Sequence, residues 1–201
     1  MEFRDVVRKR RMVRTYDPDR AVPPEAVEAM LETALHSPSA GFSQGWGFLV
    51  LTEPADRDLF WVSTTPAGSD VPSRWLVGMR AAPVIIVPMS NKEAYLDRYA
   101  EADKGWADRD ENRWPVPYWH IDTGMASLLM LLTAVDRGLG ACFFGVPPSR
   151  TSTFRDAFGV PAAYTPIGAI TVGYPAPRDF RSPSLKRGRR GVDEVVHRGR
   201  W

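Results

Sequence analysis

The amino-acid sequence predicts an α+β or three-layer α/β domain built on a mixed sheet of about four or five strands. Apolar residues recur at helical spacing in several segments, and short apolar runs bounded by Gly or Pro lie between them, as is typical of buried strands. The chain has 201 residues, of which 44% are hydrophobic and 25% charged. This size and composition fit a single domain over residues 1–201, or one protomer of a tight oligomer.

Two helices are predicted near the N-terminus. Residues 2–10 carry apolar side chains at helical spacing, which indicates a short first helix. The DPDRAVPPE segment that follows contains three prolines and is predicted to be a loop. Pro24 suits the first turn of a second helix, which apolar residues at i, i+3 and i+4 extend to about His36 before Pro38 ends it.

The middle and C-terminal parts of the chain supply the strands and a long helix. The predicted strands are the apolar runs 47–52, 83–88, 141–146 and 166–175. Residues 123–137, capped by Asp122 or Thr123, predict a helix that is apolar on nearly all sides, which indicates burial in the centre of the protein or at a subunit interface. Its most apolar run, Met125–Val135, is about half as long as the roughly 20 residues of a membrane span, so no membrane partner is expected.

Two further segments lack a regular apolar pattern. Within residues 88–120 the polar and aromatic stretch is periodic only in its first half, which predicts a short helix followed by an irregular flap. The end of this flap, RWPVPYWH, gathers aromatic side chains that either line a ligand pocket or belong to the core or a dimer contact. Residues 176–201 are rich in Pro, Gly and Arg and predict an extended basic tail.

The net charge is only +2, but the charges are unevenly distributed along the chain. Residues 1–20 hold seven Lys/Arg and four Asp/Glu, residues 178–201 hold eight and three, and the middle is therefore acidic. If the two ends meet, they form one positive patch. Such a patch fits a nucleic-acid groove or two solvated tails, and the lack of helix-turn-helix, zinc-finger and RNA-recognition patterns argues against nucleic acid.

Catalytic motifs of the chain's own are missing from the sequence. It contains no G-x-S-x-G, P-loop, H-E-x-x-H or G-x-G-x-x-G motif, and its three histidines are scattered. The lone Cys142 cannot form an internal disulfide, and no Cys/His spacing suggests a metal site. If the protein is an enzyme, a bound cofactor therefore carries the chemistry. The first 20 residues lack an apolar signal core, which predicts a cytoplasmic location.

The basic cluster Arg10, Arg11 and Arg14 is the first candidate binding site. These arginines follow a predicted helix and precede a turn. The planar guanidinium group can donate two parallel, charge-assisted hydrogen bonds to a phosphate. Cations are also favourable at a helix C-terminus without any ligand, so the cluster indicates either a phosphate site or a solvated helix end.

Five stretches together resemble the nitroreductase family of flavoproteins in order and spacing, over essentially the whole chain. They are RRMVRTYD, PSAGFSQGW, GLGACFFG, VGYP and KRGRRGVDEVVH. The resemblance implies an α+β fold, a three-layer α/β/α sandwich with a mixed, mainly antiparallel sheet. It also implies an intertwined homodimer with two FMN sites at the interface.

The resemblance brings both basic ends of the chain to the FMN phosphate and ribityl chain. The matching positions are Arg10, Arg11, Met12, Arg14, Arg187 and Arg189. Met12 stands where the family usually has Ser, so a side-chain hydroxyl contact is lost there.

Other matching positions lie around the flavin ring. They are Pro38, Ser39, Ala40, Phe42, Gln44, Phe144, Gly145 and Val146. The first three match a segment that approaches the flavin of the partner subunit, and a backbone N–H in the last three could donate to flavin N5. Phe42 replaces the usual Asn. Its ring either favours flat, apolar acceptors or packs into the dimer interface.

The implied activity is an FMN-dependent oxidoreductase. Hydride passes from NAD(P)H through the flavin to a flat acceptor, such as a nitroaromatic compound or a quinone, by a ping-pong mechanism, and no protein side chain acts as a catalyst. The expected substrate pocket consists of Phe42, Tyr118, Trp119 and His120. The alternatives are a flavin-binding protein of low turnover, a family member that uses a deazaflavin, and one that fragments its own flavin.

Overall fold

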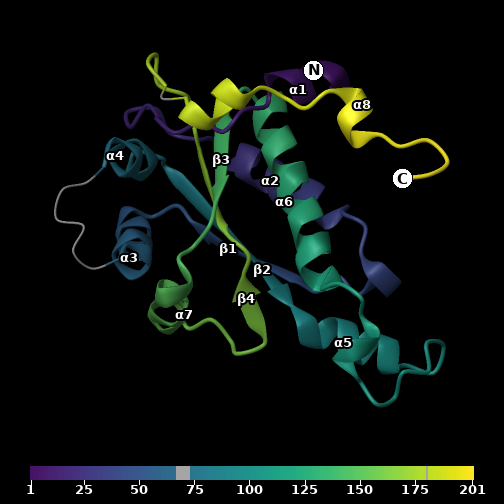
Figure 1. Ribbon diagram of the computed structural model, residues 1–201. Helices are drawn as coiled ribbons and strands as arrows, with labels where there is room; N and C mark the ends of the chain where they lie inside the picture. Colours follow the sequence, from purple (N-terminus) through teal and green to yellow (C-terminus); the bar gives the residue numbers. More distant parts are fainter. Residues whose placement is uncertain (67–72, 180) are drawn as a thin grey trace.

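Five antiparallel strands form the centre of the protein (Figure 1). The computed structural model describes residues 1–66, 73–179 and 181–201. The strands lie in the order β1 (Trp46–Leu51), β2 (Val84–Asn91), β5 (Ala169–Gly173) and β3 (Gly140–Phe144), and β4 (Tyr164–Pro166) also pairs with β2. An isolated parallel bridge between Met12 and Ala141 adds the N-terminal segment beside β3.

Helices cover both faces of this sheet, as Figure 1 shows. On one face lie α2 (Pro24–Leu35) and α6 (Tyr118–Asp136), and on the other α3 (Pro54–Thr64), α4 (Arg74–Arg80) and α7 (Thr151–Phe158). Successive side chains of a strand point to opposite faces. Within β2, Ile85 therefore belongs to the core under α3, and Ile86 to the core under α2 and α6. The predicted three-layer sandwich is confirmed.

The long helix α6 begins earlier than predicted. Thr123 is not its cap, because the Thr123 hydroxyl donates to the Trp119 carbonyl (2.7 Å) inside the helix. The helix begins at Tyr118, directly after Pro117. Tyr118, Trp119 and His120 therefore occupy the first helical turn, and not an irregular flap. The rest of the flap contains the predicted short helix, α5 (Lys92–Ala100), and one helical turn at Glu111–Arg113.

Other boundaries also differ from the predictions. The expected strand 166–175 is divided into β4 and β5 near Gly168, where a Cβ would lie 2.5 Å from the Phe143 ring. The tail is not wholly extended, since it forms helical turns at Pro183–Arg187 and in α8 (Val192–Val195). Across the described ranges, no helix combines the length and apolarity needed to cross a membrane.

Candidate cofactor-binding site

The two ends of the chain meet at a cavity of about 420 Å³, which we call the basic cavity. In Figure 1, α1 (Phe3–Lys9) and the C-terminal tail lie together at the top of the molecule. Within the described part of the chain, seven of the nine residues that line the cavity are cations, so the cavity favours an anionic ligand. The lining consists of Arg8, Lys9, Arg10, Arg11, Met12, Arg14, Arg181, Leu185 and Arg189.

The cations of the basic cavity are close enough to affect one another. Burial, and then the neighbouring charge of Arg181, lower the pKa of the Arg11 guanidinium. The Asp179 carboxylate pairs with Arg11 and accepts the backbone N–H of Arg14 (2.9 Å). Asp179 alone cannot neutralise the seven cations of the described lining, so an anion would relieve repulsion here. Arg and Lys side chains of this kind suit a phosphate group.

A buried tyrosine fixes the segment that carries the N-terminal arginines. The Tyr16 hydroxyl lies 2.9 Å from both the Val13 carbonyl and Thr171 Oγ1, and burial raises the pKa of this phenol. Met12 bridges to Ala141 on β3, and its sulfur accepts the Phe143 backbone N–H (3.4 Å). Met12 thus ties the N-terminal segment to the sheet.

The helix α4 packs closely against the same segment because it contains a glycine. A Cβ at Gly78 would lie 2.2 Å from the backbone oxygen of Arg14. Backbone cannot yield as a flexible side chain can, so any larger residue here would displace α4 or the Arg14 segment. Gly78 therefore lets α4 pack directly against the backbone of Arg14 and so helps to fix the position of Arg14 at the basic cavity.

The predicted flavin-ring positions Phe144, Gly145 and Val146 line a second cavity, of about 300 Å³, at the end of β3. The Phe144 ring stacks on Trp61, with centroids 5.7 Å apart and planes at 7°, so the wall is aromatic. Phe144 lies three residues beyond Ala141, the neighbour of Met12. At roughly 3.3 Å per residue, the strand separates these two points by about 10 Å.

The 38–44 loop, between α2 and β1, has an unusual backbone. Gly41 (φ 61°), Phe42 (φ 55°) and Gln44 (φ 50°) are all left-handed, a conformation that non-glycine residues rarely adopt. The Ser39 hydroxyl accepts the Gln44 backbone N–H (3.0 Å). The Phe42 side chain is 73% exposed, so within one chain this ring packs into no core.

The 38–44 loop lies far from the basic cavity of its own chain. The loop contacts the start of α6, where Asp122 accepts the Ala40 backbone N–H (2.8 Å). Helix α1 lies at the other end of α6, where the amino group of Met1 pairs with Asp136. The helix between these aspartates is about 21 Å long at 1.5 Å per residue. Within one chain, the 38–44 loop and α1 therefore lie at opposite ends of α6.

The predicted substrate-pocket residues do not share one cavity within a single chain. Trp119 and His120 line a cavity of about 310 Å³, and the described lining of that cavity includes neither Phe42 nor Tyr118. His120 Nδ1 lies 2.8 Å from Ser90 Oγ, and burial lowers the pKa of the imidazole. The Ser90 contact fixes the orientation of the imidazole ring at the wall of this cavity.

Comparison with known proteins places the chain in a family. Residues 7–174 match the model of the Nitroreductase family. The chain belongs to the Nitroreductase family. Two relatives are each named "Putative NADH dehydrogenase/NAD(P)H nitroreductase". The one from Methanothermobacter thermautotrophicus is 29% identical and covers 88% of this chain and 78% of its own length. The one from Archaeoglobus fulgidus is 26% identical and covers 96% and 94%.

Solved structures of other family members have the same fold. A nitroreductase family protein from Clostridium difficile superposes with a TM-score of 0.74 at 21% identity, over all of both chains. A protein from Desulfovibrio desulfuricans, crystallised in complex with FMN, has a TM-score of 0.72 at 26% identity and covers 100% of this chain and 98% of its own. The antiparallel sandwich is thus the fold of the Nitroreductase family.

Some features of this nitroreductase-family site were not predicted from the sequence. Arg181 lines the basic cavity, whereas Arg187, which was predicted to do so, is outside the described lining. Asp179 was also missed, although a carboxylate next to a basic tail is a usable signal for pairing. Arg98 contacts the 38–44 loop, and no sequence pattern links these two segments.

Proposed function

We propose that this protein is an FMN-dependent oxidoreductase that works as a homodimer. The observation that carries the proposal is the basic cavity, to which Arg10, Arg11 and Arg14 come from one end of the chain and Arg181 and Arg189 from the other. Membership of the Nitroreductase family and the FMN complex of the Desulfovibrio desulfuricans protein support it.

The residues of the site fit the parts of FMN. The basic cavity would hold the phosphate through the guanidinium groups of Arg10 and Arg189. The ribityl chain would follow β3 over the roughly 10 Å from Met12 toward Phe144, and the ring would lie at Gly145. A Cβ at Gly145 would meet no atom within 4 Å, so there is open space beside this residue. With the ring in that space, the backbone N–H of Gly145 could donate to flavin N5.

The bound flavin would supply hydride transfer, which this chain's side chains cannot perform. The chain's own contribution is to bind, orient and leave one ring face open. NAD(P)H would donate at that face and leave, and a flat acceptor such as a nitroaromatic compound or a quinone would then take its place, which gives ping-pong kinetics. Phe42 of the second subunit would form an apolar wall for the acceptor.

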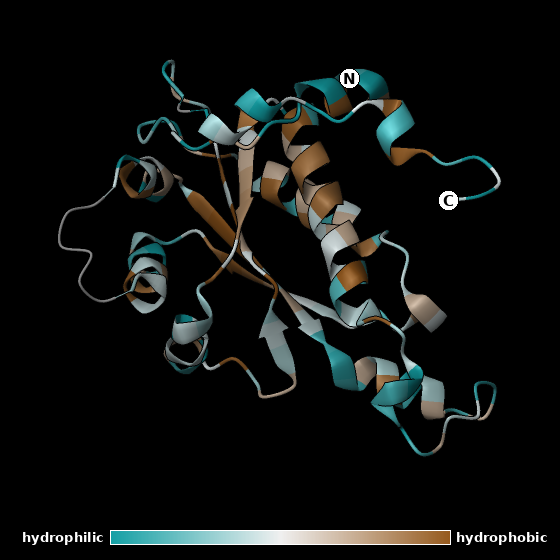
Figure 2. Ribbon diagram, in the orientation of Figure 1, coloured by the Kyte–Doolittle hydropathy of each residue, from teal (hydrophilic) through white to brown (hydrophobic). Residues whose placement is uncertain are grey.

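A second subunit supplies what one chain lacks. The 38–44 loop contacts Asp122, about 21 Å along α6 from the Asp136 end where α1 begins, and Phe42 is exposed. Ile121 (43% exposed) and Leu128 (48%) lie seven residues apart on one side of α6. Figure 2 shows that apolar residues extend over much of this helix. A partner subunit that covers this side of α6 would bring its 38–44 loop to the flavin.

The test combines the absorbance spectrum of the purified protein, the mass of the cofactor released on denaturation, and NAD(P)H oxidation with a quinone or a nitroarene. We expect a flavin spectrum, the mass of FMN and turnover with both acceptors. FMN without turnover would instead indicate a flavin-sequestering protein. The mass of a deazaflavin would indicate a deazaflavin-dependent enzyme, and fragments of FMN would indicate an enzyme that breaks down its own flavin. A colourless protein that takes up no FMN would refute the proposal.

A further inference from the structure

The 38–44 loop is held from outside by α5. Two non-glycine residues of the loop, Phe42 and Gln44, have left-handed backbone conformations. Strained conformations of this kind persist only where surrounding contacts fix them, and they concentrate at functional sites. Besides the Asp122 contact from α6, the loop is supported by one side of α5, where Tyr95, Arg98 and Tyr99 lie within about one helical turn of one another.

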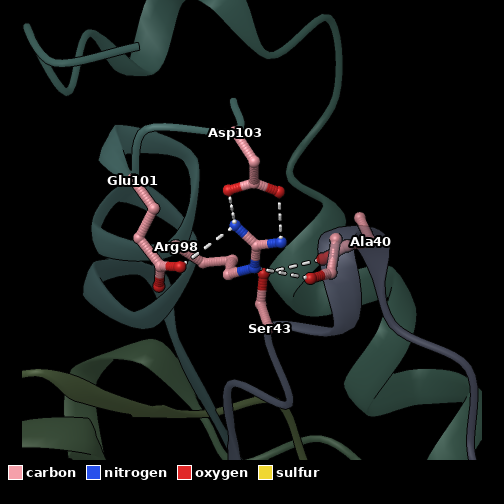
Figure 3. Close-up of polar contacts among 6 residues, drawn as sticks. Ala40, Ser43, Arg98, Glu101 and Asp103 are labelled. Atoms are coloured by element: carbon pink, nitrogen blue, oxygen red, sulfur yellow. Dashed lines mark hydrogen bonds and ion pairs between the residues drawn. The ribbon is translucent and has the colours of Figure 1, made fainter. Parts of the chain in front are cut away.

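Arg98 makes the central contact, as Figure 3 shows. Its Nε donates to the Gly41 carbonyl (3.0 Å), and its two terminal nitrogens form a bidentate pair with Asp103 (2.7 and 2.8 Å). Glu101 adds a longer ion pair at 3.3 Å. The Arg98 side chain is only 25% exposed. The guanidinium group is thus oriented by two carboxylates while its remaining edge holds the loop.

Two tyrosines of α5 complete the support. The Tyr99 ring lies so close to the loop that a Cβ at Gly41 would be 2.6 Å from it. The Tyr95 hydroxyl donates to Asp122 (2.8 Å), and the same carboxylate oxygen accepts the Ala40 N–H. Tyr99 itself packs against Trp114, with ring centroids 4.5 Å apart. Aromatic side chains of the predicted flap therefore pack together and against the 38–44 loop.

We propose that Arg98 is a positioning residue for acceptor selectivity: it fixes the 38–44 loop so that Phe42 stays in place at the acceptor site of the partner subunit. The proposal rests on the proposed function, because Phe42 meets an acceptor only in an FMN-containing dimer. Arg98 touches neither flavin nor acceptor, and acts through the Gly41 carbonyl.

The test compares Arg98→Ala and Arg98→Lys with Arg109→Ala. Arg109 is a matched control, because it lies in the same segment and pairs with Glu93 and Asp97. In Arg98→Ala, kcat/KM for a hydrophobic quinone should fall about tenfold relative to that for a small nitro compound, since misplacing a binding group costs rate steeply. Arg98→Lys should recover part of this ratio, because Lys donates one bond but lacks the fork. Arg109→Ala should leave the ratio unchanged.

Two further arms separate positioning from general destabilisation. In a Phe42→Ala background, Arg98→Ala should no longer change the acceptor ratio, because the group that it positions is gone. Hydrogen exchange of the Phe42 and Ser43 amides, which donate to Ser39 and Ala40, should become at least about tenfold faster in Arg98→Ala and not in Arg109→Ala.

The outcomes distinguish this inference from the proposed function. If wild-type protein binds no FMN, the proposed function fails, and the exchange arm still decides whether Arg98 holds the loop. If wild-type protein binds FMN and turns over, but Arg98→Ala keeps the wild-type acceptor ratio, the inference is overturned. It is also overturned if Arg109→Ala shifts the ratio as much as Arg98→Ala does.

Discussion

Arg10 lies at the junction of α1 and the basic cavity. If Arg10 binds the FMN phosphate, the Arg10→Ala substitution removes one of the cations that pair with this phosphate. Truncating one side of a charge pair typically costs about 2–5 kcal/mol, so FMN affinity should fall by roughly 30-fold or more. Titration of the apoprotein with FMN, followed by flavin fluorescence, measures this. Arg187→Ala removes a tail cation outside the described lining and should bind FMN nearly as tightly as wild type. Equal FMN affinities in wild type, Arg10→Ala and Arg187→Ala would contradict the assignment of Arg10 to the phosphate site.

His120 should make folding stability depend on pH. Burial holds the pKa of this imidazole below its value in an unfolded chain, about 6.5. As the pH falls below about 6.5, the unfolded state takes up a proton first, so the free energy of unfolding decreases until the folded-state pKa is passed.

The His120→Gln variant should lose this component. Urea unfolding at about pH 7.5 and about pH 5.5, on either side of the unfolded-state pKa, should show a larger loss of stability for wild type than for His120→Gln. Equal losses in the two proteins would mean that protonation of His120 is not coupled to folding.

At the residue scale, the sequence predicted members of the candidate site where they carry a charge or belong to a recognisable motif. Arg10, Arg11, Arg14 and Arg189 were assigned to one site from the resemblance, and the structure brings them to one cavity. Arg98 could not be found in this way. Its importance depends on the Gly41 carbonyl, 57 positions away, and a surface arginine with acidic neighbours has the same local pattern.

At the element scale, helices with a clear apolar period were predicted well, and helices stabilised by tertiary contacts were not. Helix α2 was found from its i, i+3, i+4 spacing. Helix α3 was missed, because its buried positions include Trp61, Ser63 and Thr64, which have modest helix propensity and are held by the core. The predicted start of α6 was wrong because threonine is a common helix N-cap residue, whereas the Thr123 hydroxyl donates to a carbonyl inside the helix.

The exposed side of α6 gives a prediction about assembly. Leu128 is 48% exposed near the middle of the helix. In Leu128→Glu an unpaired carboxylate would be buried at the proposed interface, which costs several kcal/mol, so the dimer should dissociate at least about 100-fold more readily. Light scattering across a dilution series measures this.

Val62→Glu is the matched control. Val62 is 66% exposed on α3, in the layer on the other side of the sheet. This variant should remain a dimer at micromolar concentration. A wild-type protein that is monomeric and still binds FMN tightly would show that the two subunits do not share a site.

At the scale of the whole molecule, FMN should link the two ends of the chain and thereby stabilise the fold. A ligand at about 100 times its Kd adds about 2.7 kcal/mol to the free energy of unfolding, which corresponds to a rise of roughly 5–10 °C in Tm for a chain of this size. Differential scanning fluorimetry with and without FMN measures the shift.

The same shift tests the contribution of the tail. The Arg181→Ala/Arg189→Ala double variant should keep most of the Tm of the apoprotein but lose most of the FMN-dependent rise. Riboflavin, which lacks the phosphate, should raise the wild-type Tm less than FMN does. A full rise with riboflavin would place the binding energy in the ring and not in the basic cavity.

The convergence of the two ends also orders events during synthesis. Arg14 donates its N–H to Asp179, a residue 165 positions later in the chain, and Arg181 and Arg189 follow later still. A ribosome adds about 5–20 residues per second, so roughly ten to thirty seconds pass between the synthesis of the N-terminal arginines and that of Arg181 and Arg189. The basic cavity is therefore completed only after residue 189 has been made, and a chain that stops before Arg181 carries Arg10 and Arg11 without the cations that complete the pocket.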